Sequence, residues 1–398
     1  MSLSNGRTYL AIPGPSVMPD AVLNAMHRAA PNIYAGELPE MMPELMADLN
    51  RVARSTSHCA IYICNGHGAW EASLANVVSR GDEVLVLATG NFALGWAETA
   101  RRMGLECTVL DHGRRSTIDY DRLAETLNAD SAHRFKAVLM VQVDTATSIR
   151  NDVPAVRAAL DAAGHPALFM VDCIACLGVD DFHMDAWGVD VMITASQKGL
   201  MTPPGIAFVF FNDKADRARD KVEFISQYWD WRPRAFPDQF YERFAGTAPT
   251  HHLYGLRAAL DMIHTEGLDN VLARHAKLAR MVWAAFEVWG QEGPVELNVT
   301  DRALRSHAVT AVRIGDPHGE TLRQWLIENT GVTLGIGIGM VDKGAPGADG
   351  FFRVGHMGHV NAHMVMGVLG NIDSGLKALG LPHGRGALEA ASAVCAEA

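Results

Sequence analysis

A single lysine, Lys198, lies between a short apolar run at residues 190–195 and a turn rich in proline and glycine at residues 202–205. We expect this lysine just past the carboxyl end of a buried strand, facing a crevice. A partly desolvated lysine loses proton affinity, and its neutral amine can form a Schiff base with an aldehyde. A lysine in a surface loop is the alternative interpretation, which the local pattern alone does not exclude.

Asp172 ends another apolar run, residues 167–172, which precedes the run before Lys198. If the two runs are parallel strands of one sheet, both side chains emerge at the same edge. A carboxylate there can keep a pyridine nitrogen protonated, which makes the ring an electron sink. The alternative is a cap or loop hydrogen bond, which is common for Asp after a strand. Together, Asp172 and Lys198 favour a cofactor site.

A third feature is the turn Gly66-His67-Gly68, between the apolar run 60–64 and a helix expected from about Ala69. Glycines at such a turn let backbone amides approach an anion, and the amino terminus of a helix favours negative charge. The turn lacks the third glycine of the dinucleotide pattern and the Gly-Lys-Ser/Thr ending of a Walker loop. We interpret it as a phosphate-binding turn, with a merely structural glycine turn as the alternative.

The elements that must position these residues follow from hydrophobic patterning between residues 58 and 212. Seven short apolar runs, most rich in Val, Ile or Leu, alternate with amphipathic stretches, so buried strands alternate with helices. This alternation predicts an α/β fold with a mostly parallel seven-stranded sheet and helices on both faces. The predicted strands are residues 60–64, 83–88, 107–110, 137–142, 167–172, 190–195 and 206–211, and predicted helices include residues 70–79, 93–103 and 153–163.

The pattern changes after Asn212. Residues 222–252 combine aromatics, prolines and charges, which is typical of irregular structure with functional potential. A helical region over residues 253–289 leads to a smaller C-terminal α+β domain, with strands expected at 307–314, 331–335 and 351–355 and helices at 320–328 and 362–379. We therefore expect an N-terminal segment, 1–20, that contributes to the active site, a large domain, 21–285, and a small domain, 286–398.

Composition limits the partners of the chain. Its 398 residues are 48% hydrophobic, enough for a large core. Acidic residues outnumber basic ones by 45 to 34, which argues against nucleic acid or an anionic membrane as partner. The sequence has no signal-peptide pattern and no apolar stretch of membrane-spanning length. Six scattered cysteines suit a reducing compartment, so we expect a cytoplasmic globular protein.

Taken together, these motifs resemble a known family. The sequence is similar to fold-type I pyridoxal-phosphate (PLP) enzymes of the class V aminotransferases, close to the alanine–glyoxylate and serine–glyoxylate (serine–pyruvate) group. The resemblance extends from residues 13–16 to residues 353–358, and its most specific part is residues 196–198 with 203–205 downstream. It implies a homodimer with shared active sites that moves an amino group from serine or alanine to glyoxylate or pyruvate.

The resemblance also implies a role for each matching residue. Lys198 would form the aldimine with PLP and move the proton between the substrate α-carbon and the cofactor. Asp172 would pair with the pyridinium nitrogen, and Arg353 would bind the substrate carboxylate as a two-pronged donor. The remaining implied residues are Gly66, His67 and Gln197 at the phosphate, Phe92 on the cofactor ring, Thr145 at its phenolic oxygen, Gly14 in the substrate pocket, and Phe244 and Thr247 at the phosphate of the neighbouring subunit.

Two of these positions depart from the family pattern. Many relatives have Trp where Phe92 stands, so we expect stacking with less surface. Some relatives have Tyr where Phe244 stands, so a hydroxyl contact is absent here. The structural alternatives are plain core packing for Phe92 and a strand-end salt bridge for Arg353.

Three other functions remain open. A relative could use pyridoxamine as the amino donor to pyruvate. A lyase or desulfurase of the same fold would need a reactive cysteine on a mobile loop, and no cysteine occurs between Cys176 and Cys395. A non-catalytic binding protein could retain the scaffold, although intact Lys198 and Asp172 argue against it.

Two further clusters have spacings that could bind a metal. They are Cys173-x-x-Cys176, and His356 with His359 and His363. The cysteines lie in an apolar context, and Gly358 interrupts the histidines, so structural roles are favoured for both. We predict no metal site.

Overall fold

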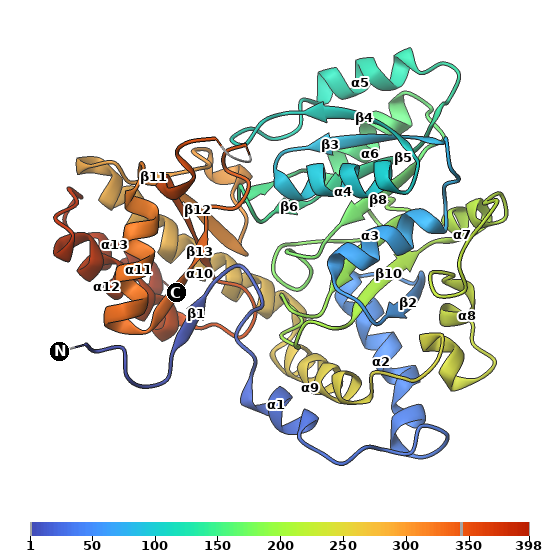
Figure 1. Ribbon diagram of the computed structural model, residues 1–398, viewed down its shortest axis with the longest axis horizontal. Coiled ribbons are helices and arrows are strands. Elements are labelled where there is room, and N and C mark those ends of the chain that lie inside the picture. Colours follow the sequence, from blue (N-terminus) through green and yellow to red (C-terminus); the bar gives the residue numbers. More distant parts are fainter. Residues whose placement is uncertain (1, 343–344, 398) are drawn as a thin grey trace.

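The computed structural model describes residues 2–342 and 345–397, and its larger body is built on a seven-stranded sheet (Figure 1). The strand order is β2-β10-β9-β8-β5-β3-β4, and only β10 runs antiparallel to its neighbours. The strands are β2 (His58–Tyr62), β3 (Glu83–Ala88), β4 (Glu106–Asp111), β5 (Phe135–Val141), β8 (Leu168–Asp172), β9 (Val191–Ala195) and β10 (Ala207–Phe211). The predicted mostly parallel seven-stranded sheet is confirmed.

Helices cover both faces of this sheet because alternate strand residues point to opposite sides. Val84 and Val86 join one apolar cluster, and Leu85 and Leu87 join another. The first cluster includes side chains of α3 (Gly66–Ala75) and α4 (Asn91–Arg102). The second includes side chains of α2 (Glu37–Ala53), α5 (Tyr120–Ala129), α6 (Val153–Ala162) and α9 (Thr250–Glu266).

The helix α3 begins earlier than its hydrophobic pattern predicts, at Gly66 rather than near Ala69. The side chain of Asn65 accounts for the difference, since its Oδ1 accepts hydrogen bonds from the amides of His67 and Gly68 at 3.1 and 3.3 Å. A capped amino terminus satisfies donors that the first turn leaves free. The glycine turn is therefore the first turn of the helix itself.

The smaller body contains a five-stranded sheet of order β1-β13-β14-β12-β11. Its elements are β1 (Tyr9–Ala11), β11 (Glu296–Leu297), β12 (Val309–Arg313), β13 (Val332–Ile336), β14 (Phe351–Gly355), α11 (His318–Thr330), α12 (Ala362–Ala378) and α13 (Ala387–Ala396). The three predicted strands and two predicted helices are present, whereas β1 and β11 were not predicted. The strand β1 pairs in parallel with β13, which places the beginning of the chain beside its C-terminal part (Figure 1).

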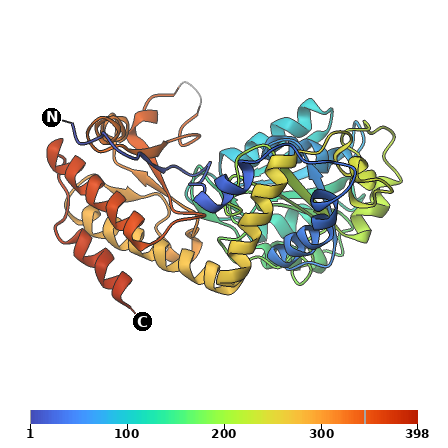
Figure 2. The same cartoon turned by 90° about the horizontal axis from the view of Figure 1, so that it is seen from below.

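The predicted helical region over 253–289 consists of two helices, α9 and α10 (Leu268–Trp289). They meet at Gly267, whose φ of +86° is a conformation that favours glycine. The helix α10 extends from the larger to the smaller body (Figure 2), and its residues from Leu278 onward join the apolar core of the smaller one. The boundary at residue 285 lies within α10 and stays a prediction. Within residues 2–342 and 345–397, no helix is long and apolar enough to cross a membrane.

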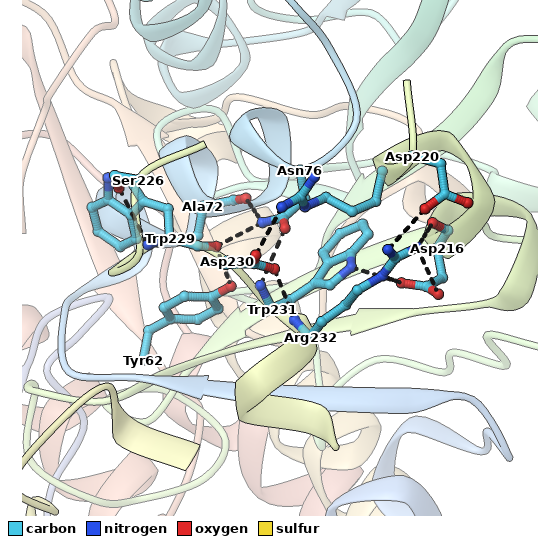
Figure 3. Close-up of polar contacts among 11 residues, drawn as sticks. Tyr62, Ala72, Asn76, Asp216, Asp220, Ser226, Trp229, Asp230, Trp231 and Arg232 are labelled. Atoms are coloured by element: carbon cyan, nitrogen blue, oxygen red, sulfur yellow. Dashed lines mark hydrogen bonds and ion pairs between the residues drawn. The ribbon is translucent and has the colours of Figure 1, made fainter. Parts of the chain in front are cut away.

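The segment after β10 is anchored by an aromatic stack on the sheet and by polar contacts, of which Figure 3 shows the polar ones. Trp231 stacks on Phe211 with ring centroids 4.1 Å apart, and its amide donates to Asn76 Oδ1 at 3.1 Å. The Asp216 carboxylate accepts from Trp231 Nε1 at 3.1 Å and from Arg232 Nε at 2.9 Å. The region predicted as irregular thus contains α8 (Arg232–Ala235) and the 3-10 helix η1 (Phe240–Phe244) after α7 (Asp213–Arg219).

The remaining elements are short. They are α1 (Asp20–Met26), the β6 (Val143–Asp144) and β7 (Ile149–Arg150) hairpin, and the 3-10 helices η2 (Gly290–Glu292), η3 (Arg302–Leu304) and η4 (Ala348–Gly350).

Replacing Asp216 with Ala should lower the free energy of unfolding by about 1–3 kcal/mol, because the fully buried Trp231 indole loses its acceptor. Urea unfolding followed by tryptophan fluorescence measures the change. Asp220→Ala is the matched control, since Asp220 pairs with the same Arg232 but its side chain is 62% exposed. Asp220→Ala should lower the free energy of unfolding by less than about 1 kcal/mol. Equal losses in the two variants would contradict the anchoring role of Asp216.

Candidate active site

The structure brings Asp172 and Lys198 to one edge of the sheet. Asp172 is the last residue of β8, and Lys198 follows the end of β9, its parallel neighbour. Both line a cavity of about 260 Å³ at the carboxyl ends of these strands. Of the other residues singled out from the sequence, this cavity is also lined by Gly14, Gly66, His67, Phe92, Thr145 and Gln197.

Asp172 is a buried carboxylate, 3% exposed, with one donor on each oxygen. Trp70 Nε1 donates to Oδ2 and the amide of Ile174 donates to Oδ1, both at 2.7 Å. Burial raises the pKa of Asp172 to about 7, although the two donors favour the charged form. A cation placed beside this carboxylate would therefore be bound strongly.

Lys198 carries an amine that is readily deprotonated. Burial, with a smaller contribution from the Arg353 cation, lowers the pKa of Lys198 to about 8. Its Nζ donates a hydrogen bond to the carbonyl of Pro13. A Cβ on Gly14, whose φ is +100°, would lie 2.6 Å from Nζ. Glycine at position 14 thus leaves space for the lysine side chain.

The N-terminal segment is fastened to the lysine loop by Ser16. The amide of Ser16 donates to the carbonyl of Gln197 at 2.9 Å, and its Oγ donates to the carbonyl of Lys198 at 2.8 Å. Gly14 and Pro15 of this segment line the cavity, and the contribution of the segment to an active site stays a prediction.

The predicted phosphate site lies at the first turn of α3. The first amides of a helix have no intrahelical acceptor, although Asn65 Oδ1 engages those of His67 and Gly68. Within the described ranges the side-chain amide of Gln197 makes no hydrogen bond, and its buried Oε1 is without a partner. An anion in the cavity could be bound by N–H groups of this first helical turn, and the Gln197 side-chain NH2 group, which makes no hydrogen bond among the described residues, is a further possible donor.

Asp144 lies next in sequence to two residues that line the cavity, Val143 and Thr145. Its Oδ2 accepts from the amide of Phe92 at 2.8 Å and its Oδ1 from the amide of Ala146 at 2.9 Å. Phe92 lies in the first turn of α4 and is half-buried. A Cβ on Gly90 would lie 2.4 Å from the Asp144 carboxyl carbon, so only glycine fits there. Asp144 thus fixes the amino end of α4, which carries Phe92.

Arg353, in β14, is a buried cation without an acidic partner. Its side chain donates from Nε to the carbonyl of Ile336 at 2.7 Å and from Nη1 to the carbonyl of Thr145 at 2.8 Å. No carboxylate lies within ion-pair distance of it in the described part of the chain. Burial lowers the pKa of Arg353 to about 10. Arg353 does not line the cavity itself but contacts Thr145, which does. Its remaining N–H groups can donate hydrogen bonds to an anion.

Phe244 and Thr247 are not brought to this cavity. Phe244 is buried against Phe240, with ring centroids 5.4 Å apart, and Thr247 is exposed. Their predicted contact with the site of a neighbouring subunit involves a second chain and stays a prediction.

Of the two clusters with metal-like spacing, the cysteine pair and His356 make hydrogen bonds inside the core, whereas His359 and His363 are exposed. The thiols of Cys173 and Cys176 donate to Gln142 Oε1 at 3.5 and 2.9 Å. His356 Nε2 bonds the hydroxyl of Thr310 at 2.9 Å. Outside the masked positions 1, 343–344 and 398, no group of three or more His, Cys, Asp or Glu side chains could hold a metal ion.

The cavity fits PLP, the cofactor that the sequence resemblance implies. Asp172 suits a protonated ring nitrogen, and the first turn of α3, which also lines the cavity, suits a phosphate. The Lys198 amine lies in the same cavity, where the missing Cβ of Gly14 leaves it room. The donor set thus offers one partner for each charged or reactive group of this cofactor.

Sequence reasoning missed the residues that support the site. No role was assigned from the sequence to Trp70, Asp144, Ser16 or the carbonyl of Pro13. Asp144 adjoins Thr145 and Trp70 follows His67 by one helical turn, so proximity in sequence was the available signal. Their partners, however, are 52 and 102 positions away for Asp144 and Trp70.

Comparison with known proteins agrees with this geometry. The family model described as "Aminotransferase class-V" matches residues 8–341. Serine–glyoxylate aminotransferase of Arabidopsis thaliana is 34% identical over 384 residues, covering 95% of this chain and 92% of that protein. L-Aspartate–glyoxylate aminotransferase of Paracoccus denitrificans is 33% identical over 375 residues, covering 93% and 91%. The crystal structure of ureidoglycine–glyoxylate aminotransferase from Bacillus subtilis superposes with a TM-score of 0.88 at 25% identity, over 100% of both chains. The chain therefore belongs to the class V aminotransferase family.

Proposed function

We propose that the protein transfers an amino group from a small amino acid, serine or alanine, to glyoxylate or pyruvate, with PLP as cofactor. The observation that carries the proposal is one cavity that joins Lys198 and Asp172 and has the unpaired cation Arg353 at its border. Two relatives, at 34% and 33% identity, are a serine–glyoxylate and an L-aspartate–glyoxylate aminotransferase. Their names support glyoxylate as the amino acceptor.

The cofactor, when bound, supplies an aldehyde for the substrate amine and a ring that accepts electrons from the α-carbon. Asp172 would hold the ring nitrogen in its protonated form. The first turn of α3, with Gly66 and His67, and the Gln197 amide would bind the phosphate. Phe92 would pack on the ring, and the Thr145 hydroxyl would donate to the phenolic oxygen.

Lys198 holds the cofactor and then moves a proton. Its lowered proton affinity makes the neutral amine available near neutral pH, as a nucleophile and as a base for the α-proton. Pro13 offers a carbonyl acceptor for the amine when it is free. The same side chain can therefore take a proton from the α-carbon and return it to the cofactor.

Arg353 orients the substrate. A guanidinium binds a carboxylate through two parallel hydrogen bonds, which fixes the direction of the α-carbon. A single clamp of this kind favours small neutral amino acids over dicarboxylic ones. Gly14, opposite Lys198, keeps the substrate pocket open on the side of the N-terminal segment.

We further propose a cytoplasmic homodimer whose subunits share active sites. Tyr241 and Phe236, near Phe244, are each 50% exposed, and exposed aromatic side chains suit a protein interface. Thr247 is also exposed and can reach a neighbouring chain. The six free cysteines suit a reducing compartment, and the net charge of −11 argues against nucleic acid as partner.

The half-reaction tests this function directly. Serine, alanine or aspartate is added singly to PLP-loaded protein, and the true donor should convert the visible absorbance of the cofactor to near-ultraviolet absorbance. Glyoxylate or pyruvate should restore the visible band.

Lys198→Ala should lower the rate of amino transfer by about 10²–10⁴-fold, because the proton carrier is lost. Failure of the protein to take up PLP, or unchanged turnover in that variant, would contradict the proposal; activity with pyridoxamine alone would identify the pyridoxamine-using relative.

Arg353→Ala should raise KM for the amino donor by about tenfold to a hundredfold, because hydrogen bonds to the charged carboxylate are lost. Steady-state kinetics with the donor identified above gives the value. Arg313→Ala is the matched control, since Arg313 lies in β12 of the same sheet and pairs with Glu296. Equal kinetics in native protein and the Arg353 variant would remove this residue from the substrate site.

The rate at which apoprotein takes up PLP should rise with pH through about 8 and then level off, because only the neutral Lys198 amine attacks the aldehyde. Stopped-flow absorbance would measure this uptake rate from about pH 6.5 to about pH 9.5, a range that spans the pKa of Lys198. Arg353→Ala removes a cation that lowers the pKa of Lys198, so the midpoint should move to higher pH in that variant. A rate that is independent of pH would refute a titrating lysine.

A further inference from the structure

Trp70 makes the one side-chain hydrogen bond that reaches Asp172 in the described part of the chain. Its Nε1 donates to Oδ2 at 2.7 Å, and the amide of Ile174 holds Oδ1 at the same distance. With one donor on each oxygen, the plane of the carboxylate is set. The residues around Trp70 in the sequence do not predict this contact.

We propose that Trp70 is a positioning residue for the cofactor: its indole N–H keeps Asp172 ionised and oriented, so that the pyridine nitrogen stays protonated. The inference deepens the proposed function and rests on it, since it takes PLP as the ligand. A hydrogen bond donated to a carboxylate favours the charged form. Without it, Asp172 would be more basic and would draw the proton away from the ring nitrogen.

The surroundings of Trp70 hold its indole in place. The side chain is 1% exposed and lies nearly parallel to Trp96 of α4, with ring centroids 6.2 Å apart and planes at 14°. His67, one turn earlier on α3, packs edge-on at 4.5 Å. A hydrogen bond in such an apolar setting is stronger than one in water. The helix α3 thus offers His67 toward the phosphate and Trp70 toward the carboxylate that serves the ring nitrogen.

The chain contains a matched control for this role. Trp96 is also fully buried and belongs to the same apolar cluster, but its Nε1 has no acceptor among the described residues. Replacing Trp with Phe removes the same atoms at either position. Only at position 70 does the change also remove a hydrogen bond to Asp172.

The test compares Trp70→Phe and Trp96→Phe in PLP titrations of apoprotein. Trp70→Phe should weaken PLP binding by about tenfold or more, and Trp96→Phe by less than about twofold, although both variants should lose thermal stability. The pH titration of the cofactor absorbance should shift only in the Trp70 variant, with kcat falling more than KM changes. In an Asp172→Ala background, Trp70→Phe should have little further effect on PLP affinity.

The inference would be overturned if the two Phe variants bound PLP equally well. It would also be overturned if Trp70→Phe weakened PLP binding as much in the Asp172→Ala background as in native protein. Either result would leave the proposed function standing. If the Trp70 variant does not fold, ¹⁵N spectra of protein that retains Trp70 test the hydrogen bond instead. The indole resonance of Trp70 should then move on Asp172→Ala more than that of Trp96, and an unmoved Trp70 resonance would overturn the inference. Native protein that takes up no PLP would instead overturn the proposed function, and this inference with it.

Discussion

A carboxylate buried at the carboxyl end of β8 is the constraint on which the rest of the site depends. An unpaired charge is costly inside a protein, so Asp172 needs fixed donors and a cation. Trp70 and the amide of Ile174 provide the donors. Lys198 lines the same cavity, and a ring with a protonated nitrogen, as in the proposed cofactor, would supply a cation beside Asp172.

The helices that border the cavity are also fixed by specific side-chain contacts. The helix α3 begins at its Asn65 cap, and both its first turn and Trp70 line the cavity. The helix α4 is held at its amino end by Asp144, whose neighbour Thr145 contacts Arg353. Each helix therefore carries residues that line the cavity and makes a contact that supports the site, so a shift of either helix would disturb both.

The beginning of the chain joins the two bodies at the site. After β1 pairs with β13 of the smaller sheet, the chain turns at Pro13 and Gly14 against Lys198 and is fastened there by Ser16. Arg353 of the same small sheet contacts Thr145 of the larger body. The clamp proposed for the substrate and the lysine proposed for the cofactor are thereby held by overlapping contacts between the bodies.

The sequence by itself determined the alternation of strands and helices, the sheet edge shared by Asp172 and Lys198, and the glycine turn, because each leaves a local pattern of period or residue type. Tertiary structure alone decided the start of α3, the pairing of β1 and the partners of Asp144 and Trp70. The hydrogen bond from Trp70 to Asp172 joins residues 102 positions apart. Such a contact depends on how helices pack across a sheet, and no local sequence pattern encodes that packing.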